Sequence, residues 1–169
     1  MRPNDEAAFR DFVTARSPAL LRTAYLLTGD FGLAEDAVQA MFGRVYQSWP
    51  KIQHREAADS YCRRALIREV GSWRRRRRIQ HVLTDQVPDR GAIDEQYDGS
   101  DVLRAALLSL PQKQRAVVVL RYYADLSEAE VADLLDISPG SVKQHTHRAL
   151  TKLREVLGSE SALIEETER

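Results

Sequence analysis

The chain has 169 residues, of which 43% are hydrophobic, and its formal net charge is zero. This hydrophobic content is enough for a packed core, so the composition excludes wholesale disorder. No apolar run approaches the ~18 residues of a membrane span, and no apolar signal segment opens the chain, so we expect a soluble, cytoplasmic protein without membrane insertion. The single cysteine, Cys62, excludes an internal disulfide.

The charges are distributed unevenly along the chain. Residues 1–78 carry 15 Lys and Arg against 9 Asp and Glu, residues 79–100 carry 1 against 5, and residues 101–169 carry 9 against 11. This asymmetry predicts a basic module at 1–78, an acidic linker at 79–100, a second module at 101–157 and an acidic tail at 158–169. Glycine and proline with little apolar periodicity also favour a flexible linker.

Apolar residues recur at intervals of three and four, which predicts an all-α fold of two small helical domains. The first helical region is expected over about 5–28. Pro18 falls inside it, so we expect a break or kink near Arg16–Ser17, because proline cannot donate a helical hydrogen bond. Gly29 is the expected C-terminal cap.

A second helix is expected from Asp30 or Gly32 to about Ser48, with one apolar and one polar face. A solvated surface is the simpler interpretation of the polar face, and a partner-docking surface is the alternative. The residues of interest on the polar face are Asp36, Gln39 and Gln47.

A loop over about 50–59 is expected next, followed by a third helix from about Glu56 or Ser60 to Arg78. Five consecutive arginines close this helix, and Tyr61 and Trp73 lie within it. Such a block of positive charge is typical of phosphate binding, and aromatic side chains beside it can stack on unpaired bases. A solubilising helix end is the alternative, because arginines near a helix C-terminus also suit its dipole.

The segment 126–157 predicts two helices joined by a tight turn. Ser127 and Glu130 form a capping box at the start of the first helix, and Ser138 is the expected N-cap of the second. Asp136 occupies a turn position where glycine is usual, and aspartate tolerates the left-handed conformation better than most residues. The pattern is typical of a helix-turn-helix, which places its second helix in the DNA major groove.

The second of these helices carries charges of one sign only, because there is no acid between Ser138 and Arg154. Gln144 is suited to contact adenine, and Lys143 or Arg148 to contact guanine or phosphate. The outward residues that we expect to contact DNA are Ser141, Lys143, Gln144, His147 and Arg148.

Motifs of catalysis are missing from the sequence, which has no glycine-rich phosphate loop, no nucleophile elbow and no cysteine cluster. His145 and His147 point about 200° apart on a helix and cannot share a metal ion. The sequence therefore predicts a protein that is not an enzyme and needs no cofactor, metal or small-molecule substrate. A nucleic-acid-modifying enzyme is the rival class, and these absences oppose it.

Three stretches resemble, in order and spacing, regions two and four of bacterial RNA polymerase sigma factors of the extracytoplasmic-function subgroup, the sigma-E-like family. The resemblance spans about 9–78 and 103–157. Its motifs are AEDAVQAMFGRVYQSW (34–49), SYCRRALIREVGSWRRRRR (60–78) and LSLPQKQRAVVVLRYYADLSEAEVADLLDISPGSVKQHTHRALTKLR (108–154). It implies a factor that binds core RNA polymerase and promoter DNA and directs promoter recognition, promoter melting and transcription initiation. An anti-sigma factor is a further partner by family, although no residue identifies one.

The resemblance also implies roles for individual residues. Asp36, Gln39 and Gln47 lie where family members dock on the polymerase, and the helix-turn-helix residues named above correspond to minus-thirty-five contacts. The loop 54–59 and Tyr61 lie where a flipped minus-ten base is held. The residues assigned to the minus-ten element are His54, Tyr61, Arg64, Arg68, Trp73, Arg74, Arg75, Arg76 and Arg77.

Three positions depart from the family pattern. Arg68 stands where asparagine is usual, Ala40 replaces a frequent acid, and Asp136 replaces the turn glycine. The first affects the expected minus-ten preference and the second the expected affinity for the polymerase. A stand-alone helix-turn-helix regulator is the alternative function, but it needs a dimer interface or a ligand domain, and the first module shows neither.

Overall fold

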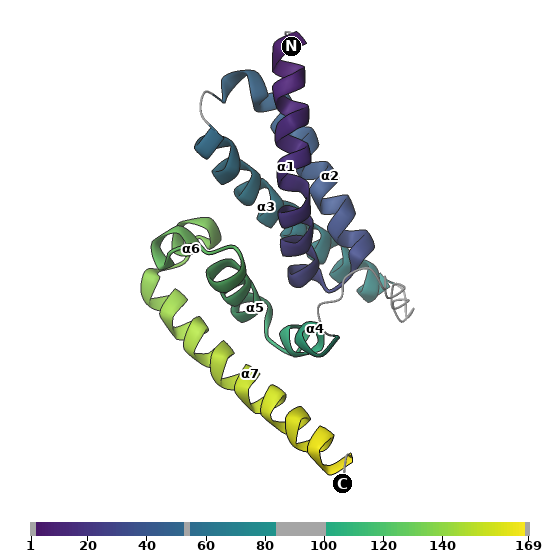
Figure 1. The fold of residues 1–169 in the computed structure, drawn as a ribbon, viewed down its shortest axis with the longest axis vertical. Coiled ribbons are helices and arrows are strands. Elements are labelled where there is room, and N and C mark those ends of the chain that lie inside the picture. Colours follow the sequence, from purple (N-terminus) through teal and green to yellow (C-terminus); the bar gives the residue numbers. More distant parts are fainter. Residues whose placement is uncertain (1–2, 53–54, 84–100, 168–169) are drawn as a thin grey trace. The chain divides into compact units, whose positions relative to one another are not determined.

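The computed structural model describes residues 3–52, 55–83 and 101–167, and every regular element in these ranges is helical (Figure 1). The chain divides into two compact units, Met1–Asp94 and Glu95–Arg169. The predicted all-α fold of two small helical domains is therefore confirmed.

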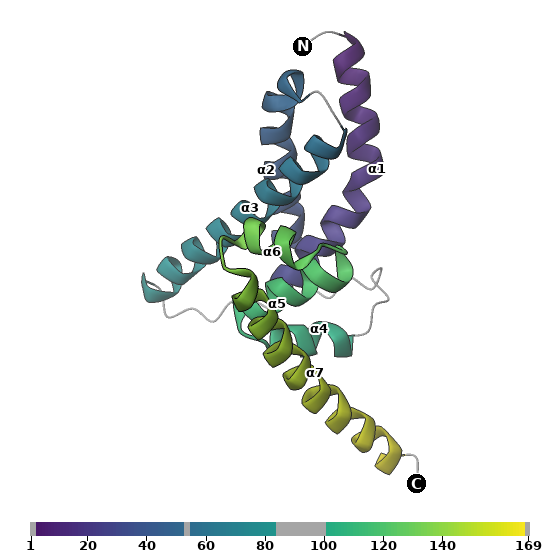
Figure 2. The same ribbon diagram turned by 90° about the vertical axis from the view of Figure 1, so that its left-hand side faces the viewer.

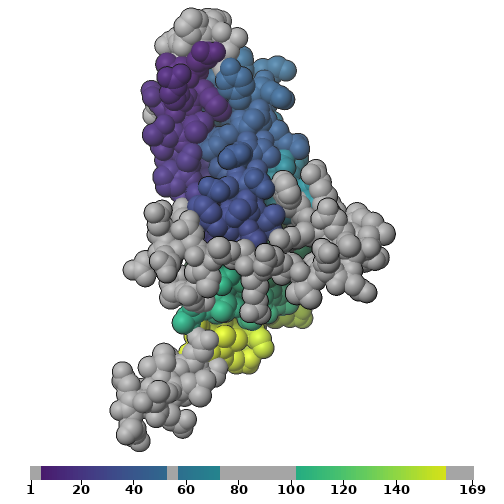
Figure 3. Space-filling model, turned by 90° about the vertical axis from the view of Figure 1, so that its right-hand side faces the viewer, coloured from purple at the N-terminus to yellow at the C-terminus, as the bar shows by residue number. Residues whose placement is uncertain are grey.

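The first unit contains three long helices: α1 (Pro3–Thr28), α2 (Phe31–Ser48) and α3 (Arg55–Leu83), with a 3₁₀ turn, η1 (Trp49–Lys51), after α2. Helix α2 packs against both α1 and α3 (Figure 2), and α1 and α2 lie side by side along one face of the unit (Figure 3). The Asp30 side chain caps α2 by accepting a hydrogen bond from the Leu33 N–H at 2.9 Å. The fully buried side chains at the centre are Met41, Val45, Cys62 and Leu66.

Of the two expected effects of Pro18, the break is wrong, because α1 continues through this residue. The proline ring is exposed. Since the carbonyl of Thr14 that loses its usual partner belongs to the same exposed stretch, water can satisfy it. The apolar contacts of Phe12, Ala24 and Leu27 hold the helix on either side of the interruption.

The third helix begins at Arg55, next to the earlier of its two expected starts, Glu56, and ends later than the sequence predicts. Residues 55–59, expected in a loop, form the first turn of α3, and residues 79–83, expected in the linker, form its last turns. Neither glycine nor proline follows Arg78 until Pro88, so nothing local stops the helix at the arginine block. Residue 54 of the expected loop lies outside the described residues.

The second unit contains α4 (Asp101–Leu108), α5 (Gln112–Val118), α6 (Glu128–Leu135) and α7 (Pro139–Thr167). Helix α7 packs against the other three helices. Its buried residues, Val142, Ala149 and Leu153, recur on one side of the helix, and Val117, Leu120 and Val131 complete the core.

Two further features belong to this unit. The helix after Pro111 changes into a π-helical turn, η2 (Val119–Tyr123), whose end is marked by Asp125 at φ 53°. The acidic tail after Gly158 continues α7, which is helical to Thr167. One glycine costs only about 1 kcal/mol in a helix interior relative to alanine, which is insufficient to end a helix whose flanking residues favour it.

Candidate nucleic-acid interface

The turn between α6 and α7 is built by short-range hydrogen bonds. The Ser127 hydroxyl accepts from the Glu130 N–H at 3.2 Å, and the Glu130 carboxylate accepts from the Ser127 N–H at 2.7 Å, so the predicted capping box is confirmed. Asp136 ends α6 in the left-handed conformation, with φ 55°. The Ile137 N–H then reaches back to the Ala132 carbonyl at 3.0 Å, which closes the helix end.

Helix α7 starts as predicted, with Ser138 as its cap. The Ser138 hydroxyl accepts from the Ser141 N–H at 3.0 Å and lies 2.9 Å from the Ser141 hydroxyl. Pro139 occupies the first helical position, where its missing N–H has no consequence. Ser141 is half-buried and engaged in this cap, so it is less available to DNA than the sequence suggested.

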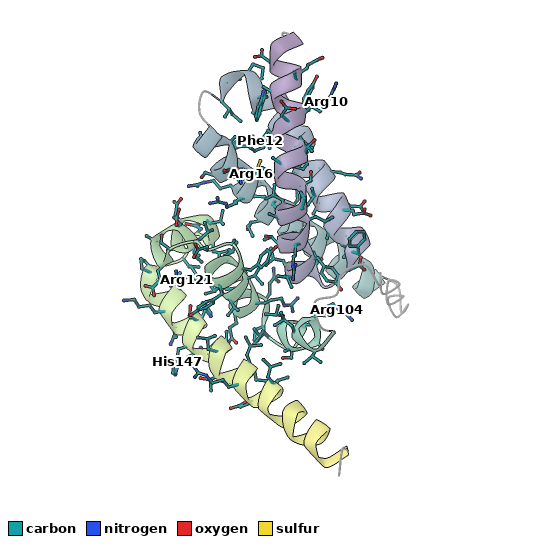
Figure 4. The ribbon with its side chains drawn as sticks, viewed as in Figure 1. Arg10, Phe12, Arg16, Arg104, Arg121 and His147 are labelled. Atoms are coloured by element: carbon teal, nitrogen blue, oxygen red, sulfur yellow. The ribbon has the colours of Figure 1, made fainter. Side chains whose placement is uncertain are left out.

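The other outward residues of α7 share one exposed side of the helix. Lys143, Gln144, His147 and Arg148 are all exposed, and His147 lies on the side of α7 turned away from α5 (Figure 4). Lys143 Nζ is 3.9 Å from Glu128 Oε2 of α6, with both side chains open to solvent, so this ion pair contributes little. The structure therefore brings four of the five residues expected at the minus-thirty-five element onto one free surface.

His145 faces the other way from these residues and is half-buried. Its Nδ1 is shielded from solvent and has no hydrogen-bond partner among the described residues. His145 is therefore partly packed within the second unit and is not presented for contact with a phosphate.

Two arginines with internal roles support the helix-turn-helix, and neither role was predicted from the sequence. Arg115 is buried, and its guanidinium donates to the carbonyls of Leu108 and Leu110 at 3.3 and 3.1 Å, fixing the turn between α4 and α5. Arg121 Nη1 donates to the Leu126 carbonyl at 2.6 Å and so fixes the entry to α6. Only their position beside chain turns could have signalled these roles.

In the first unit, α3 carries the residues expected at the minus-ten element. Tyr61, Arg64 and Arg68 recur at helical spacing on one side and are exposed. The Tyr61 hydroxyl lies 3.1 Å from the Ser48 hydroxyl at the end of α2 and shares a hydrogen bond with it. Trp73 and Arg74, Arg75, Arg76 and Arg77 belong to α3, but their side chains lie outside the described part, as does the whole of His54.

The polar face of α2 is exposed as expected. Asp36, Gln39 and Gln47 lie on one side of the helix, opposite the buried residues. At the far end of α2, Phe9 of α1 packs edge-on against Tyr46 and Trp49, with ring centroids 5.1 Å apart in both pairs. This aromatic cluster holds α1 against the end of α2 that leads to η1.

Within the described ranges, no helix is long and apolar enough to cross a membrane. Over the same part of the chain, His, Cys, Asp and Glu side chains form no group of three that could hold a metal ion.

Two family models match this chain: sigma-70 region 2 over residues 12–79, and sigma-70 region 4 over residues 100–153. The RNA polymerase sigma-E factor of Streptomyces avermitilis is 40% identical over 153 residues, covering 89% of this chain and 86% of that protein. The extracytoplasmic-function sigma factor SigL of Mycobacterium tuberculosis is 32% identical over 162 residues, covering 89% of each chain.

A solved structure has the same fold. The sigma factor RpoE of Bartonella quintana, in complex with the anti-sigma factor NepR, superposes with a TM-score of 0.77 at 24% identity, covering 89% of this chain and 97% of that one. With both regions matched in order, the chain belongs to the extracytoplasmic-function group of RNA polymerase sigma factors and is sigma-E-like.

Proposed function

We propose that this protein is a promoter-specificity subunit that binds core RNA polymerase and directs transcription initiation. The observation that carries the proposal is that each family region contains a helix with an exposed polar side: α3 in region two and α7 in region four. The protein acts with the polymerase on chromosomal DNA, in the cytoplasm. RNA synthesis itself is the chemistry of the polymerase, so this chain needs no active site.

Region four is proposed to dock α7 in the major groove of the minus-thirty-five element. Lys143, Gln144, His147 and Arg148 supply base and phosphate contacts from one exposed side. Ser141 contributes chiefly by fixing the helix start, since its hydroxyl is already bonded to Ser138.

Region two is proposed to bind the polymerase through α2 and the minus-ten element through α3. The exposed side chains of Asp36, Gln39 and Gln47 form the docking face. Tyr61, Arg64 and Arg68 provide an aromatic ring and positive charge for an opened strand. His54, Trp73 and the arginines 74–77 extend this assignment from the family pattern.

An anti-sigma factor is proposed as a third partner. The relative of known structure from Bartonella quintana was solved with such a protein bound. Pull-down with a candidate anti-sigma factor, followed by loss of transcription on its addition, tests this partner.

The deciding experiment is run-off transcription with purified core polymerase across a pool of promoters. We expect transcripts from a subset of promoters only when this protein is present. Absence of any protein-dependent transcript, together with absence of binding to core polymerase, would contradict the proposed function.

Arg148→Ala tests the assignment of α7. If Arg148 contacts a base, discrimination at one minus-thirty-five position falls by about 1–3 kcal/mol. Lys152→Ala is the matched control, because it removes the same charge one turn further along the exposed side of α7. Competition binding with promoter duplexes altered at each position measures both variants, and an unchanged sequence preference for Arg148→Ala would reduce its role to phosphate contact or none.

A further inference from the structure

Two acidic side chains of α3 turn away from solvent, and each pairs with an arginine of another helix. Asp59 Oδ2 is 2.5 Å from Arg16 Nη2 of α1, and Glu69 Oε1 is 2.6 Å from Arg44 Nε of α2. The carboxylates are only 20% and 6% exposed, whereas the two arginine side chains are 48% and 60% exposed. Arg16 lies on the side of α1 that faces α3 (Figure 4).

The burial of Glu69 distinguishes this pair from an ordinary surface ion pair. A carboxylate removed from water is stable in its ionised form only when a partner compensates the lost hydration. Arg44 supplies that compensation from α2, so removing the arginine takes away the ion-pair partner that the described residues give this buried carboxylate. An exposed pair would contribute little, but this one constrains the helix that carries the acid.

The two pairs bracket the residues assigned to the minus-ten element. Asp59 and Glu69 are ten residues apart, about 15 Å along the helix axis, and Tyr61, Arg64 and Arg68 lie between them. Because the anchors come from two different helices, they restrict both rotation of α3 about its axis and sliding along it. The hydrogen bond between the Tyr61 and Ser48 hydroxyls adds a third link in the same stretch.

We propose that Arg16 and Arg44 are positioning residues for minus-ten recognition: they hold α3 in register through Asp59 and Glu69 and do not bind DNA themselves. This inference rests on the proposed function. It runs against the simplest interpretation of their charge, because both belong to the basic module of the chain and would otherwise be counted as phosphate contacts.

Neutralising Glu69 distinguishes direct action on DNA from positioning of α3, because the two interpretations predict changes in promoter opening of opposite sign. If Arg44 and Glu69 acted on DNA through their own charges, Arg44→Gln would weaken promoter opening, whereas Glu69→Gln would strengthen it by removing a repulsive charge. If they act as a pair that positions α3, each single substitution weakens opening. The double variant Arg44→Gln/Glu69→Gln then opens the promoter at least as well as the more impaired of the two single variants.

The experiment uses the full chain in holoenzyme at saturating concentration, with 2-aminopurine in the minus-ten strand reporting base unstacking. We expect Arg44→Gln and Glu69→Gln each to lower the equilibrium constant for opening about three- to thirtyfold, and their combination to be non-additive. Binding of the same holoenzymes to a minus-thirty-five duplex should be unchanged. Arg16→Gln and Asp59→Asn should act in the same direction and more weakly, because Asp59 is more exposed.

Arg10→Gln is the matched control, since it removes an exposed arginine of α1. It should leave opening unchanged, while Arg44→Lys, which keeps a charge near Glu69, should recover part of the loss. Circular dichroism checks that each variant is folded. If Glu69→Gln is unfolded, the difference in opening between Arg44→Gln and Arg44→Lys tests the proposal instead, because substitutions of the mostly exposed Arg44 side chain leave the core intact.

A rise in opening for Glu69→Gln, equal losses for Arg44→Gln and Arg44→Lys, or wild-type opening in both single variants would overturn the proposal. So would an equal loss of minus-thirty-five binding, which would indicate general destabilisation. If the wild-type protein directs no transcription at all, the proposed function fails instead.

Discussion

Cys62 lies on the inner side of α3 and is 1% exposed. Burial, and after it the nearby Asp59 carboxylate, raises the pKa of the Cys62 thiol from 9.0 to about 12, although Arg16 and Arg63 act in the opposite direction. The thiol therefore stays protonated at neutral pH, and the thiolate is the reactive form. We expect a thiol reagent to label the folded chain slowly and the urea-unfolded chain rapidly. Fast labelling without denaturant would contradict this burial.

The same pKa shift predicts a loss of stability at alkaline pH. Above pH 9.0 the unfolded chain releases the thiol proton and the folded chain retains it, so the free energy of unfolding falls as pH rises. Below pH 9.0 both states keep the proton, and this thiol does not change the stability. The difference in unfolding free energy between wild type and Cys62→Ala should change by about 2 kcal/mol between about pH 8 and pH 10.5, in favour of the variant.

Urea titrations followed by tryptophan fluorescence measure this difference, because both tryptophans, Trp49 and Trp73, belong to the first unit. Other groups that titrate in this range affect both proteins equally. Parallel pH profiles would show that the Cys62 thiol does not ionise differently in the two states.

The arginines show why the sequence could predict surfaces but not every contact. Arg148 has no acid near it in the sequence and is exposed, as predicted. Arg115 is buried against the carbonyls at the end of α4, and Arg44 reaches Glu69, which is 25 positions along the chain. The side on which a helical arginine lies follows from periodicity, but its partner depends on how helices distant in sequence pack.

At the scale of elements, the turn between α6 and α7 offers a direct test of backbone strain. Asp136 has φ 55° and ψ 51°, a conformation that glycine adopts without steric cost. Asp136→Gly should stabilise the α6–α7 pair by up to about 1 kcal/mol, partly offset by the greater freedom of glycine in the unfolded chain. Asp136→Ala should destabilise it by about 1 kcal/mol.

Amide hydrogen exchange in α6 and α7 measures this change where it occurs. Asp136→Asn is the matched control, since it removes the charge and keeps a side chain that tolerates the left-handed conformation. If the asparagine variant is as stable as the glycine variant, the charge of Asp136, not its backbone conformation, determines the stability of the turn.

The starts of α6 and α7 were predictable because their determinants lie within three residues. Ser127 and Ser138 each cap their helix as the sequence indicated, and the cap of α2 is Asp30, one of its two expected starts. Helix ends and interruptions depended on more distant packing: α1 passes through Pro18, and α3 continues to Leu83. The π-helical turn at Val119–Tyr123 has no local signal in the sequence either.

At the scale of the whole molecule, the net charge of zero conceals segments of opposite charge. Residues 1–78 carry an excess of positive charge, and residues 79–100 carry 5 acids against 1 base. A net charge of zero limits non-specific attraction to DNA over long distances, while α3 and α7 keep local positive surfaces. Specific binding then depends on engaging both promoter elements at once, which requires the two units to remain covalently connected.

This dependence can be measured by cutting the chain between its units. A protease site inserted after Gly91 lies in the segment predicted to be the linker. Before cleavage, binding by one unit raises the effective concentration of the other to about millimolar, so both elements are engaged together. After cleavage, at micromolar protein, we expect promoter-complex formation to fall by roughly 10²-fold or more. The uninserted chain treated with the same protease controls for cleavage elsewhere, and equal transcription from cut and uncut protein would show that core polymerase alone holds the two units in place.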